Sequence, residues 1–357
     1  MTGEPQALFG VYVHIPFCAR RCDYCAFATW TDRHHLQAAY ADACVGEISS
    51  ASLPPATSVF FGGGTPSLLE PSLLLSVLDA IERVDGAEVT VECNPDTVTP
   101  TLLEAYRAGG VTRLSFGVQS MVPHVLASLG RTHDPANVRT CASLATSLGF
   151  ESWSMDLIHG AAGESSDDWR RTLDEVLSLE PPHVSAYALT VEPGTPLAAD
   201  PSRHPDDDDE ADKYLLAEVA CVAAGLSSYE ISNWARPGHE CRHNLLYWSQ
   251  GDYRGIGCAA HSHAGGRRWW NVRTPERYIS AVAAGRSVEA ASESLDDESR
   301  RVEGLQLSLR TRAGVPRSAL SVGDLDDLDG LVVDDGERVR LSVTGRLLAN
   351  EVAVRLR

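Results

Sequence analysis

Six short β-type runs alternate with helix-length amphipathic runs over the first two thirds of the chain, and this alternation restricts the fold more than any other feature. The expected strands are FGVYVHIP (9–16), SVFFGG (58–63), AEVTVECNP (87–95), RLSFGVQ (113–119), FESWSMDLIHG (150–160) and HVSAYALTVE (183–192). Between them, apolar residues such as those at 74, 77, 78 and 81 repeat with the spacing of a one-sided helix. Six β-then-α units predict an α/β fold, with a parallel sheet and helices outside it.

Six units are too few for a closed eight-stranded barrel, so an open barrel and a doubly wound sheet are both compatible with the pattern. In (β/α) barrels, functional residues collect at the carboxyl ends of the strands. Here three cysteines follow the first strand and GGGT (62–65) follows the second, while Glu92, Gln119 and Asp156 lie at or near the ends of the next three. This distribution favours a partial (β/α)6 barrel with one functional rim.

The chain is strongly acidic, with 49 acidic and 30 basic residues and a formal net charge of −19. Such a surface repels phosphate backbones and anionic lipid headgroups, so we expect no nucleic-acid partner. No apolar run approaches the roughly 20 residues that span a bilayer, and the start of the chain lacks a signal-peptide pattern. We therefore expect a cytoplasmic protein without an integral membrane segment.

Cys18, Cys22 and Cys25 differ from the other six cysteines because they share one loop, spaced C-x3-C-x2-C. Nine cysteines in a reducing compartment do not form a disulfide framework. A structural zinc site commonly uses two separate C-x2-C pairs, and the sequence has no second pair elsewhere. A 4Fe-4S cluster takes one thiolate per iron, so three thiolates leave one iron open to a chelating small molecule.

The segment YVHIPFCARRCDYCAF (12–27) resembles the signature of radical S-adenosylmethionine (SAM) proteins. The resemblance implies a 4Fe-4S cluster held by Cys18, Cys22 and Cys25, with the amino and carboxyl groups of SAM on the fourth iron. The rim residues suit this ligand, because glycines at 62–64 allow the backbone to touch SAM. Glu92 can accept hydrogen bonds from the ribose hydroxyls or the ammonium group of SAM.

Further along the chain the resemblance narrows to the anaerobic coproporphyrinogen III oxidase family. LSFGVQS (114–120), LGRTHD (129–134), MDLIHG (155–160) and SAYALTVEPGTPL (185–197) are similar to that family's motifs, in the same order. The resemblance places a first set of SAM contacts on Tyr12, Gly63, Gly64, Thr65 and Glu92, and a second set on Gln119, Arg131 and Asp156. Other interpretations stay open. Gln119 and Asp156 can be buried polar groups that brace the rim, and Gln119, Arg131 and Asp156 can serve only the first SAM or line a vestigial substrate pocket.

Two departures separate this chain from the oxidase itself. The oxidase resembles C-x3-C-x2-C-x-C, whereas this chain has Phe27 at the position of the last cysteine, and only eleven residues precede Tyr12. A phenylalanine cannot exchange protons or electrons with a substrate as a thiol can. Residues 243–248, HNLLYW, resemble instead the H-N-x-x-Y-W motif of the heme-chaperone branch of the family, which implies heme binding through His243.

The residue types in this motif suit heme, because a neutral imidazole is an axial ligand and aromatic rings pack against a porphyrin. For an isolated histidine, the alternative is a hydrogen-bonding role in the core. Five other residues lie close in sequence and compete as ligands, but we do not assign them to heme: His239, Cys241, Cys258, His261 and His263.

We expect three parts in the chain: a radical SAM core (1–235), a connecting segment that carries the heme motif (236–275), and a C-terminal domain (276–357). In the last part, a helix around 303–309, two β runs in LVVDDGERVRLSV (331–343) and a final helix in 344–357 suggest a small winged-helix-like unit. The acidic run 206–210 is expected to be a solvated loop and the start of a helix.

The resemblance therefore implies a heme chaperone that carries a 4Fe-4S cluster and exchangeable SAM, binds heme and passes it to an unidentified acceptor protein, as a monomer or homodimer. The alternative is a radical SAM enzyme, either a coproporphyrinogen III oxidase or a methyltransferase-like relative. Oxidase activity is disfavoured because Phe27 replaces the fourth cysteine, and no catalytic residue is assigned.

Overall fold

The computed structural model describes residues 8–356, and its largest feature is a sheet of twelve strands with the order β12-β11-β10-β9-β1-β2-β3-β4-β5-β6-β8-β7. The first six strands of the chain are neighbours in sequence order and run parallel: β1 (Phe9–Ile15), β2 (Ala56–Gly63), β3 (Arg83–Cys93), β4 (Arg113–Gln119), β5 (Ser152–His159) and β6 (His183–Ala188). All six expected strands are confirmed.

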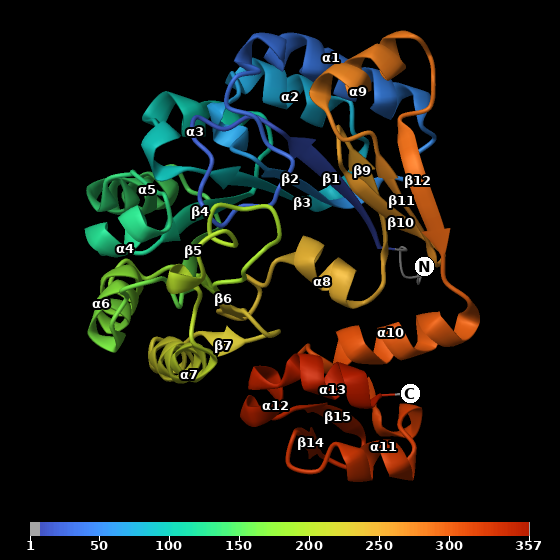
Figure 1. The fold of residues 1–357 in the computed structure, drawn as a ribbon. Helices are drawn as coiled ribbons and strands as arrows, with labels where there is room; N and C mark the ends of the chain where they lie inside the picture. Colours follow the sequence, from blue (N-terminus) through green and yellow to red (C-terminus); the bar gives the residue numbers. More distant parts are fainter. Residues whose placement is uncertain (1–7, 357) are drawn as a thin grey trace.

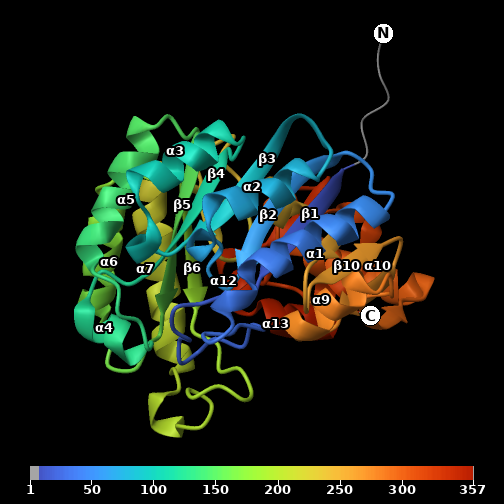
Figure 2. The ribbon, with the colours of Figure 1, turned by 90° about the horizontal axis from the view of Figure 1, so that it is seen from above.

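The strand order decides between the two sheet architectures. A doubly wound sheet reverses its strand order at a switch point and carries helices on both faces, whereas here β1 to β6 follow one another without reversal. The connecting helices cover the outer side of the curved sheet (Figure 1, Figure 2). They are α1 (Gln37–Ser50), α2 (Pro71–Asp79), α3 (Pro100–Ala108), α4 (Pro123–Ser128), α5 (Pro135–Ser147), α6 (Ser166–Leu177) and α7 (Asp207–Ala223). The expected partial (β/α)6 barrel is confirmed.

The sequence pattern does not predict a seventh parallel strand, which the structure contains. β9 (Asp252–Ile256) pairs in parallel with β1. At Gly255 an added Cβ would lie 2.1 Å from the carbonyl oxygen of His261, so this strand requires a residue that is otherwise rare in strands. The sheet continues antiparallel on one side through β10 (His261–Ala264), β11 (Arg267–Asn271) and β12 (Glu289–Ser294), and on the other through β8 (Asn233–Ala235) and β7 (Ser227–Ser228).

Several helices begin at a capping side chain followed by proline or by acidic residues. Thr99, Asp134 and Thr274 cap α3, α5 and α9 (Pro275–Ala283), and each is followed directly by proline. Asp206 caps α7, and residues 207–210 form its acidic first turn, where carboxylates are favoured by the helix dipole. The acidic run is therefore the start of a helix, as expected.

The C-terminal lobe (residues 297–356) has its own hydrophobic core, which draws on residues from Leu305 onward. It contains α10 (Asp297–Leu309), α11 (Val322–Asp327), β13 (Val315–Pro316) and the expected hairpin of β14 (Val332–Asp334) and β15 (Arg338–Leu341). The expected final helix is divided at Leu348 into α12 (Val343–Leu347) and α13 (Ala349–Arg355). β12 pairs with β11 of the large sheet, and α9 packs against α1. The domain boundary at residue 276 stays a prediction.

One short helix, α8 (Arg242–Trp248), lies between the large sheet and the C-terminal lobe (Figure 1). It contacts β1 and β2 on one side and α10 on the other. Buried Glu88 accepts hydrogen bonds from the first two backbone N–H groups of α8, those of Arg242 and His243, at 3.2 and 3.1 Å. These bonds fix α8 at the open side of the barrel. Over residues 8–356, every helix is too short or too polar to cross a lipid bilayer.

Candidate functional site

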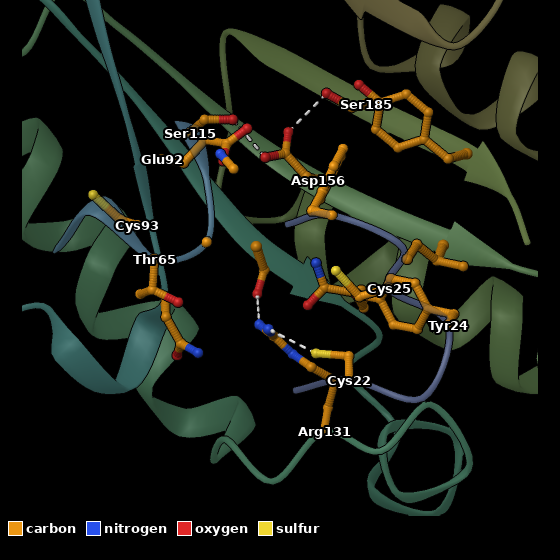
Figure 3. A pocket seen from close by; sticks show the side chains of 18 of the residues that line it. Cys22, Tyr24, Cys25, Thr65, Glu92, Cys93, Ser115, Arg131, Asp156 and Ser185 are labelled. Atoms are coloured by element: carbon orange, nitrogen blue, oxygen red, sulfur yellow. Dashed lines mark hydrogen bonds between the residues drawn. The ribbon is translucent and has the colours of Figure 1, made fainter. Parts of the chain in front are cut away.

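A cavity of about 960 Å³ runs from the rim of the barrel into its interior, and Figure 3 shows part of it. Every residue that the sequence analysis assigned to the cluster, SAM or heme lines this cavity: Tyr12, Cys18, Cys22, Cys25, Gly63, Gly64, Thr65, Glu92, Gln119, Arg131, Asp156 and His243. They come from β1 to β5, from three loops and from α8. The structure thus brings the predicted residues together, while the role of each stays a prediction.

Cys18, Cys22 and Cys25 lie on the loop that follows β1. A parallel bridge between Phe17 and Trp30 closes this loop, and the N–H of Cys18 donates to the carbonyl of Trp30 at 3.1 Å. All three cysteines are free thiols. Burial raises the pKa of Cys18 and of Cys25, so binding of a metal centre requires it to displace their protons.

Polar groups surround the thiols. The hydroxyl of Thr65 donates to Cys18 Sγ at 3.7 Å, and Arg131 Nη1 donates to Cys22 Sγ at 3.7 Å (Figure 3). Within residues 8–356, no group of three His, Cys, Asp or Glu side chains is arranged around a single metal ion, whereas a 4Fe-4S cluster takes one thiolate per iron and does not need such a group. Arg131 Nε and Gln119 Oε1 are buried without a partner in the same range, so one donor and one acceptor beside the loop are unsatisfied. A thiolate-bound cluster with a polar small-molecule ligand fits this donor set.

The glycine turn at the end of β2 packs tightly against the cysteine loop. Gly63 has a φ of +103°, and an added Cβ would lie 2.3 Å from His14 Nδ1. At Gly64 a Cβ would lie 2.6 and 2.7 Å from the carbonyl oxygens of Ile15 and Phe17. Only glycine fits these positions, and the turn therefore presents bare backbone to the cavity.

Tyr12 is oriented by a buried histidine. Its hydroxyl lies 3.1 Å from His14 Nδ1, and His14 Nε2 lies 2.9 Å from the carbonyl oxygen of Ala28. Because a carbonyl only accepts, Nε2 carries the proton and Tyr12 donates to Nδ1. Burial lowers the pKa of His14 to about 4, so the ring is neutral near pH 7. The phenol is thus fixed at the cavity wall.

Two carboxyl groups face the cavity with different surroundings. Glu92 Oε2 accepts a hydrogen bond from the N–H of Gly63 at 3.1 Å, but burial and the nearby charge of Asp156 raise the pKa of Glu92 to about 8. Asp156 accepts hydrogen bonds from the hydroxyls of Ser115 and Ser185 on the two neighbouring strands (Figure 3), and from Ser154 on its own strand. Glu92 is therefore mostly protonated at pH 7 in the absence of a cation, while Asp156 is braced in place.

His243 reaches the cavity from α8 with its side chain fully buried. Its Nδ1 lies 2.9 Å from the Ser58 hydroxyl, its Nε2 lies 2.8 Å from the Tyr247 hydroxyl, and its ring stacks on Phe60 with 5.4 Å between centroids. Burial lowers the pKa of His243 to about 3, so the imidazole is neutral. Contact between Nε2 and a metal therefore requires the Tyr247 hydroxyl to give up its hydrogen bond.

The five competing residues lie apart from this cavity: His239, Cys241, Cys258, His261 and His263. His261 lines a second cavity of about 400 Å³, whose wall shares Tyr12 and Tyr247 with the first. Its ring stacks on Trp270. The structure therefore separates these residues from the cysteine loop.

Sequence reasoning missed the residues on the inner faces of β4 and β6. Arg113, Ser115 and Gly117 line the cavity together with Gln119, and His183, Ser185 and Tyr187 do the same from β6. The signal was present, because side chains two residues apart on a strand share a face. Gln119 also has a φ of +57°, which is rare outside glycine and typical of functional sites.

Comparison with known proteins agrees with this geometry. Residues 12–176 match the radical SAM superfamily. The heme chaperone HemW of Mycobacterium tuberculosis (strain ATCC 25618 / H37Rv) is 41% identical over 99% of this chain and 95% of its own, and the heme chaperone HemW of Bacillus subtilis (strain 168) is 34% identical over 96% and 97%. Coproporphyrinogen III oxidase (HemN) from Escherichia coli, a radical SAM enzyme, has the same fold, with a TM-score of 0.85 over 99% of this chain and 90% of that chain at 24% identity. The chain therefore belongs to the HemW family of radical SAM proteins.

Proposed function

We propose that this chain is a heme chaperone that binds heme and passes it to an acceptor protein in the cytoplasm, with a 4Fe-4S cluster on Cys18, Cys22 and Cys25 and SAM beside it. The observation that carries the proposal is that the cysteine loop and His243 line one cavity. The relatives named as heme chaperones support it, because their similarity extends over nearly the whole chain.

For SAM, the first set of contacts is Tyr12, Gly63, Gly64, Thr65 and Glu92. When bound, the cluster supplies an open iron for the amino and carboxyl groups of SAM. The unsatisfied atoms Gln119 Oε1 and Arg131 Nε lie on the same cavity and are suited to a polar ligand. These two residues and Asp156 form the second set of contacts, either to the same SAM or to a second molecule.

For heme, we infer that His243 supplies a neutral imidazole and that exposed aromatic rings supply flat apolar surface. Phe27 is 62% exposed and Tyr187 is 41% exposed, although both line the cavity. Large aromatic side chains left open to solvent at a cavity favour a flat apolar ligand. Phe27 thereby offers packing surface where the oxidase pattern has a thiol.

The second candidate function is a radical SAM enzyme that oxidises coproporphyrinogen. The fold shared with HemN favours it, together with the complete set of residues around the proposed cluster and SAM sites. The absence of a thiol at position 27 disfavours it. The two functions differ in one measurable respect, because a chaperone returns heme unchanged whereas the oxidase consumes SAM and porphyrinogen.

The test uses protein whose cluster has been reconstituted without oxygen. Hemin is titrated into wild type and into His243→Ala while the Soret band is followed, and porphyrinogen decarboxylation is assayed with SAM and a reductant. We expect His243→Ala to weaken hemin binding on the order of 10-fold or more, since loss of a metal-orienting group alone costs that much. We expect no decarboxylation by the wild type.

Two variants make this result specific. His261→Ala removes a histidine of the neighbouring cavity and should leave hemin binding unchanged. Tyr247→Phe keeps the aromatic ring but frees Nε2 of His243, so hemin should bind about 2- to 10-fold more tightly, the value of one neutral hydrogen bond. Equal losses in His243→Ala and His261→Ala would contradict the His243 assignment, and turnover of coproporphyrinogen would overturn the chaperone proposal.

A further inference from the structure

The cavity continues well below the residues proposed for the cluster and SAM. Arg113, Ser115, Gly117 and Gln119 alternate along β4 and all line it. Arg113 and Gln119 pair with Ser152 and Leu157 of β5, which are five residue steps of 3.3 Å apart, so the cavity follows the sheet for about 17 Å. Gln119 lies at the rim, beside the cysteine loop, whereas Arg113 lies at the floor. The floor has no function among those proposed above.

Arg113 is a buried cation without an ion-pair partner. Its residue exposure is 3%, its Nε has no hydrogen-bond partner, and within residues 8–356 no carboxylate lies within ion-pair distance of its guanidinium. Lys213, the other buried lysine or arginine in residues 8–356, behaves differently, since its Nζ lies 2.6 Å from Asp209 and 3.2 Å from Glu164. A buried charge is costly unless it is paired, and a guanidinium cannot lose its proton to avoid this cost.

Glu88 and Asp156 are the acidic residues whose charge acts on Arg113, and both have other hydrogen-bond partners. Glu88 accepts from the N-terminal N–H groups of α8, and Asp156 accepts from three serine hydroxyls. His183 also lines the floor. Its Nε2 lies 2.9 Å from the Tyr229 hydroxyl, and its Nδ1 is buried without a partner in the described chain. Arg113 and His183 thus each carry a buried nitrogen atom without a partner, and both residues line the same end of the cavity.

We propose that Arg113 anchors a carboxylate-binding site at the floor of the cavity, and that the carboxylate it takes is a propionate of heme. Guanidinium and carboxylate groups match in a bidentate geometry, which is the strongest pairing open to this side chain. The proposal deepens the proposed function and rests on it. The same carboxylate chemistry is present in SAM, so the test separates the two sources.

The register of the sheet places this site within reach of His243. Phe60 pairs with Thr90, and Thr90 pairs with Arg113, so Phe60 and Arg113 lie two strands apart at the same level, about 10 Å. Phe60 stacks on His243. The separation of these two backbone positions is similar in size to the distance from the metal to a propionate within one heme, so the sheet spacing allows one ligand to engage both His243 and Arg113.

The experiment measures equilibrium binding of three probes to cluster-loaded wild type, Arg113→Gln and Arg113→Lys: hemin, hemin dimethyl ester and SAM. Loss of one charge-assisted pair weakens binding about 10- to 100-fold. We expect that loss for hemin in Arg113→Gln, a smaller loss in Arg113→Lys, and no change for the ester or SAM. Arg254→Gln, which removes a partly buried arginine paired with Glu47 elsewhere, is the matched control and should bind all three as wild type does.

Each other outcome has a definite meaning. A loss confined to SAM keeps the carboxylate site but assigns it to SAM. Equal losses for hemin and its ester, or no loss for any probe, overturn the proposal. If Arg113→Gln fails to unfold cooperatively, the binding of hemin, its ester and SAM is compared between wild type and Arg113→Lys instead. If wild type binds neither hemin nor the ester, the chaperone function fails, while the SAM titration still reports on Arg113.

Discussion

At the scale of single residues, Glu92 is expected to couple SAM binding to proton release. Its pKa of about 8 reflects burial and the charge of Asp156. The sulfonium and ammonium charges of SAM favour the carboxylate, so the pKa falls on binding and a proton leaves. The affinity for SAM should therefore rise with pH from about 6.5 to 8 and level off above. Calorimetry at pH 7 in two buffers of different ionisation enthalpy should show release of close to one proton.

Two variants test the origin of this proton. Glu92→Gln cannot ionise and should abolish the release. Asp156→Asn removes the neighbouring charge, which lowers the ligand-free pKa of Glu92, so fewer protons should leave on binding. Undiminished release by Glu92→Gln would show that another group titrates.

The sequence predicted which residues meet at the site better than it predicted the hydrogen bonds and ion pairs that these residues form. Cysteine spacing and strand ends were enough to place Cys18, Glu92 and the other rim residues on one cavity, because parallel strands end at one side of a sheet. The hydrogen bond between His243 and Ser58 joins segments that lie far apart in the sequence, and no local pattern encodes it. The sequence also could not show that Arg113 lacks an ion-pair partner, because pairing depends on which side chains meet in the folded cavity.

At the scale of elements, the contact between the end of β2 and the cysteine loop depends on Gly64. A methyl group there would meet the carbonyl oxygens of Ile15 and Phe17 at 2.6 and 2.7 Å, and backbone atoms cannot rotate away. We expect Gly64→Ala to lower the free energy of unfolding by about 1–3 kcal/mol. It should also lower the iron content per chain, because Phe17 directly precedes Cys18. Urea denaturation and iron analysis measure the two effects.

Gly323→Ala is the matched control for this substitution. Gly323 lies in α11, and its nearest neighbour for an added Cβ is Ser321 Oγ at 3.7 Å. Alanine favours a helix over glycine, so this variant should be as stable as wild type or slightly more stable, with unchanged iron. Normal iron loading in Gly64→Ala would show that the turn does not position the loop.

The elements with regular hydrophobic patterns were predictable, and the exceptions have physical causes. The six parallel strands carry β-branched and aromatic runs that end in turn residues. β9 was not predicted because it contains Gly255, and glycine has a low strand propensity. Glycine is needed there because the backbone of His261 approaches closely. The break between α12 and α13 was not predicted either, because the residue at the break is Leu348 rather than proline or glycine.

At the scale of the whole molecule, buried neutral histidines should make the fold sensitive to acid. Burial lowers the pKa to about 4 or about 3 at four of them, and well below the usual value at a fifth: His14, His133, His159, His243 and His183. In the unfolded chain each titrates near 6.5. Below that pH the unfolded state binds more protons, so the free energy of unfolding falls as pH falls, by several kcal/mol between about pH 6.5 and 4.5. Urea denaturation across this range measures the slope.

The opposing groups are fewer. Burial raises the pKa of Glu92 to about 8 and of Glu210 to about 7, and it also raises the pKa of Glu164 and Glu230, so these four groups favour the fold at lower pH. His159→Gln removes a histidine that lies outside the main cavity. It should reduce the fall in the free energy of unfolding between about pH 6.5 and 4.5. Constant stability from pH 7 to 4.5 would contradict the neutral burial of these rings.

The overall architecture was predictable from the alternation of strands and helices, whereas the way its open side is closed was not. α8 is only seven residues long. Its position depends on Glu88 from β3 and on contacts with α10, which are distant in sequence. Contacts between segments that are distant in sequence produce no repeating hydrophobic pattern, so the sequence does not predict them.

An unclosed sheet has two outer margins, and each could recruit a strand from another molecule. At one margin β7 is only two residues long, which gives an incoming chain little to pair with. At the other, all six residues of β12 are exposed, and Glu289 and Glu293 pair with Arg267 and Arg268 of the neighbouring strand. The margins thus resist strand-by-strand polymerisation, so the barrel can remain open for a bulky cargo without the aggregation hazard that an open barrel otherwise carries.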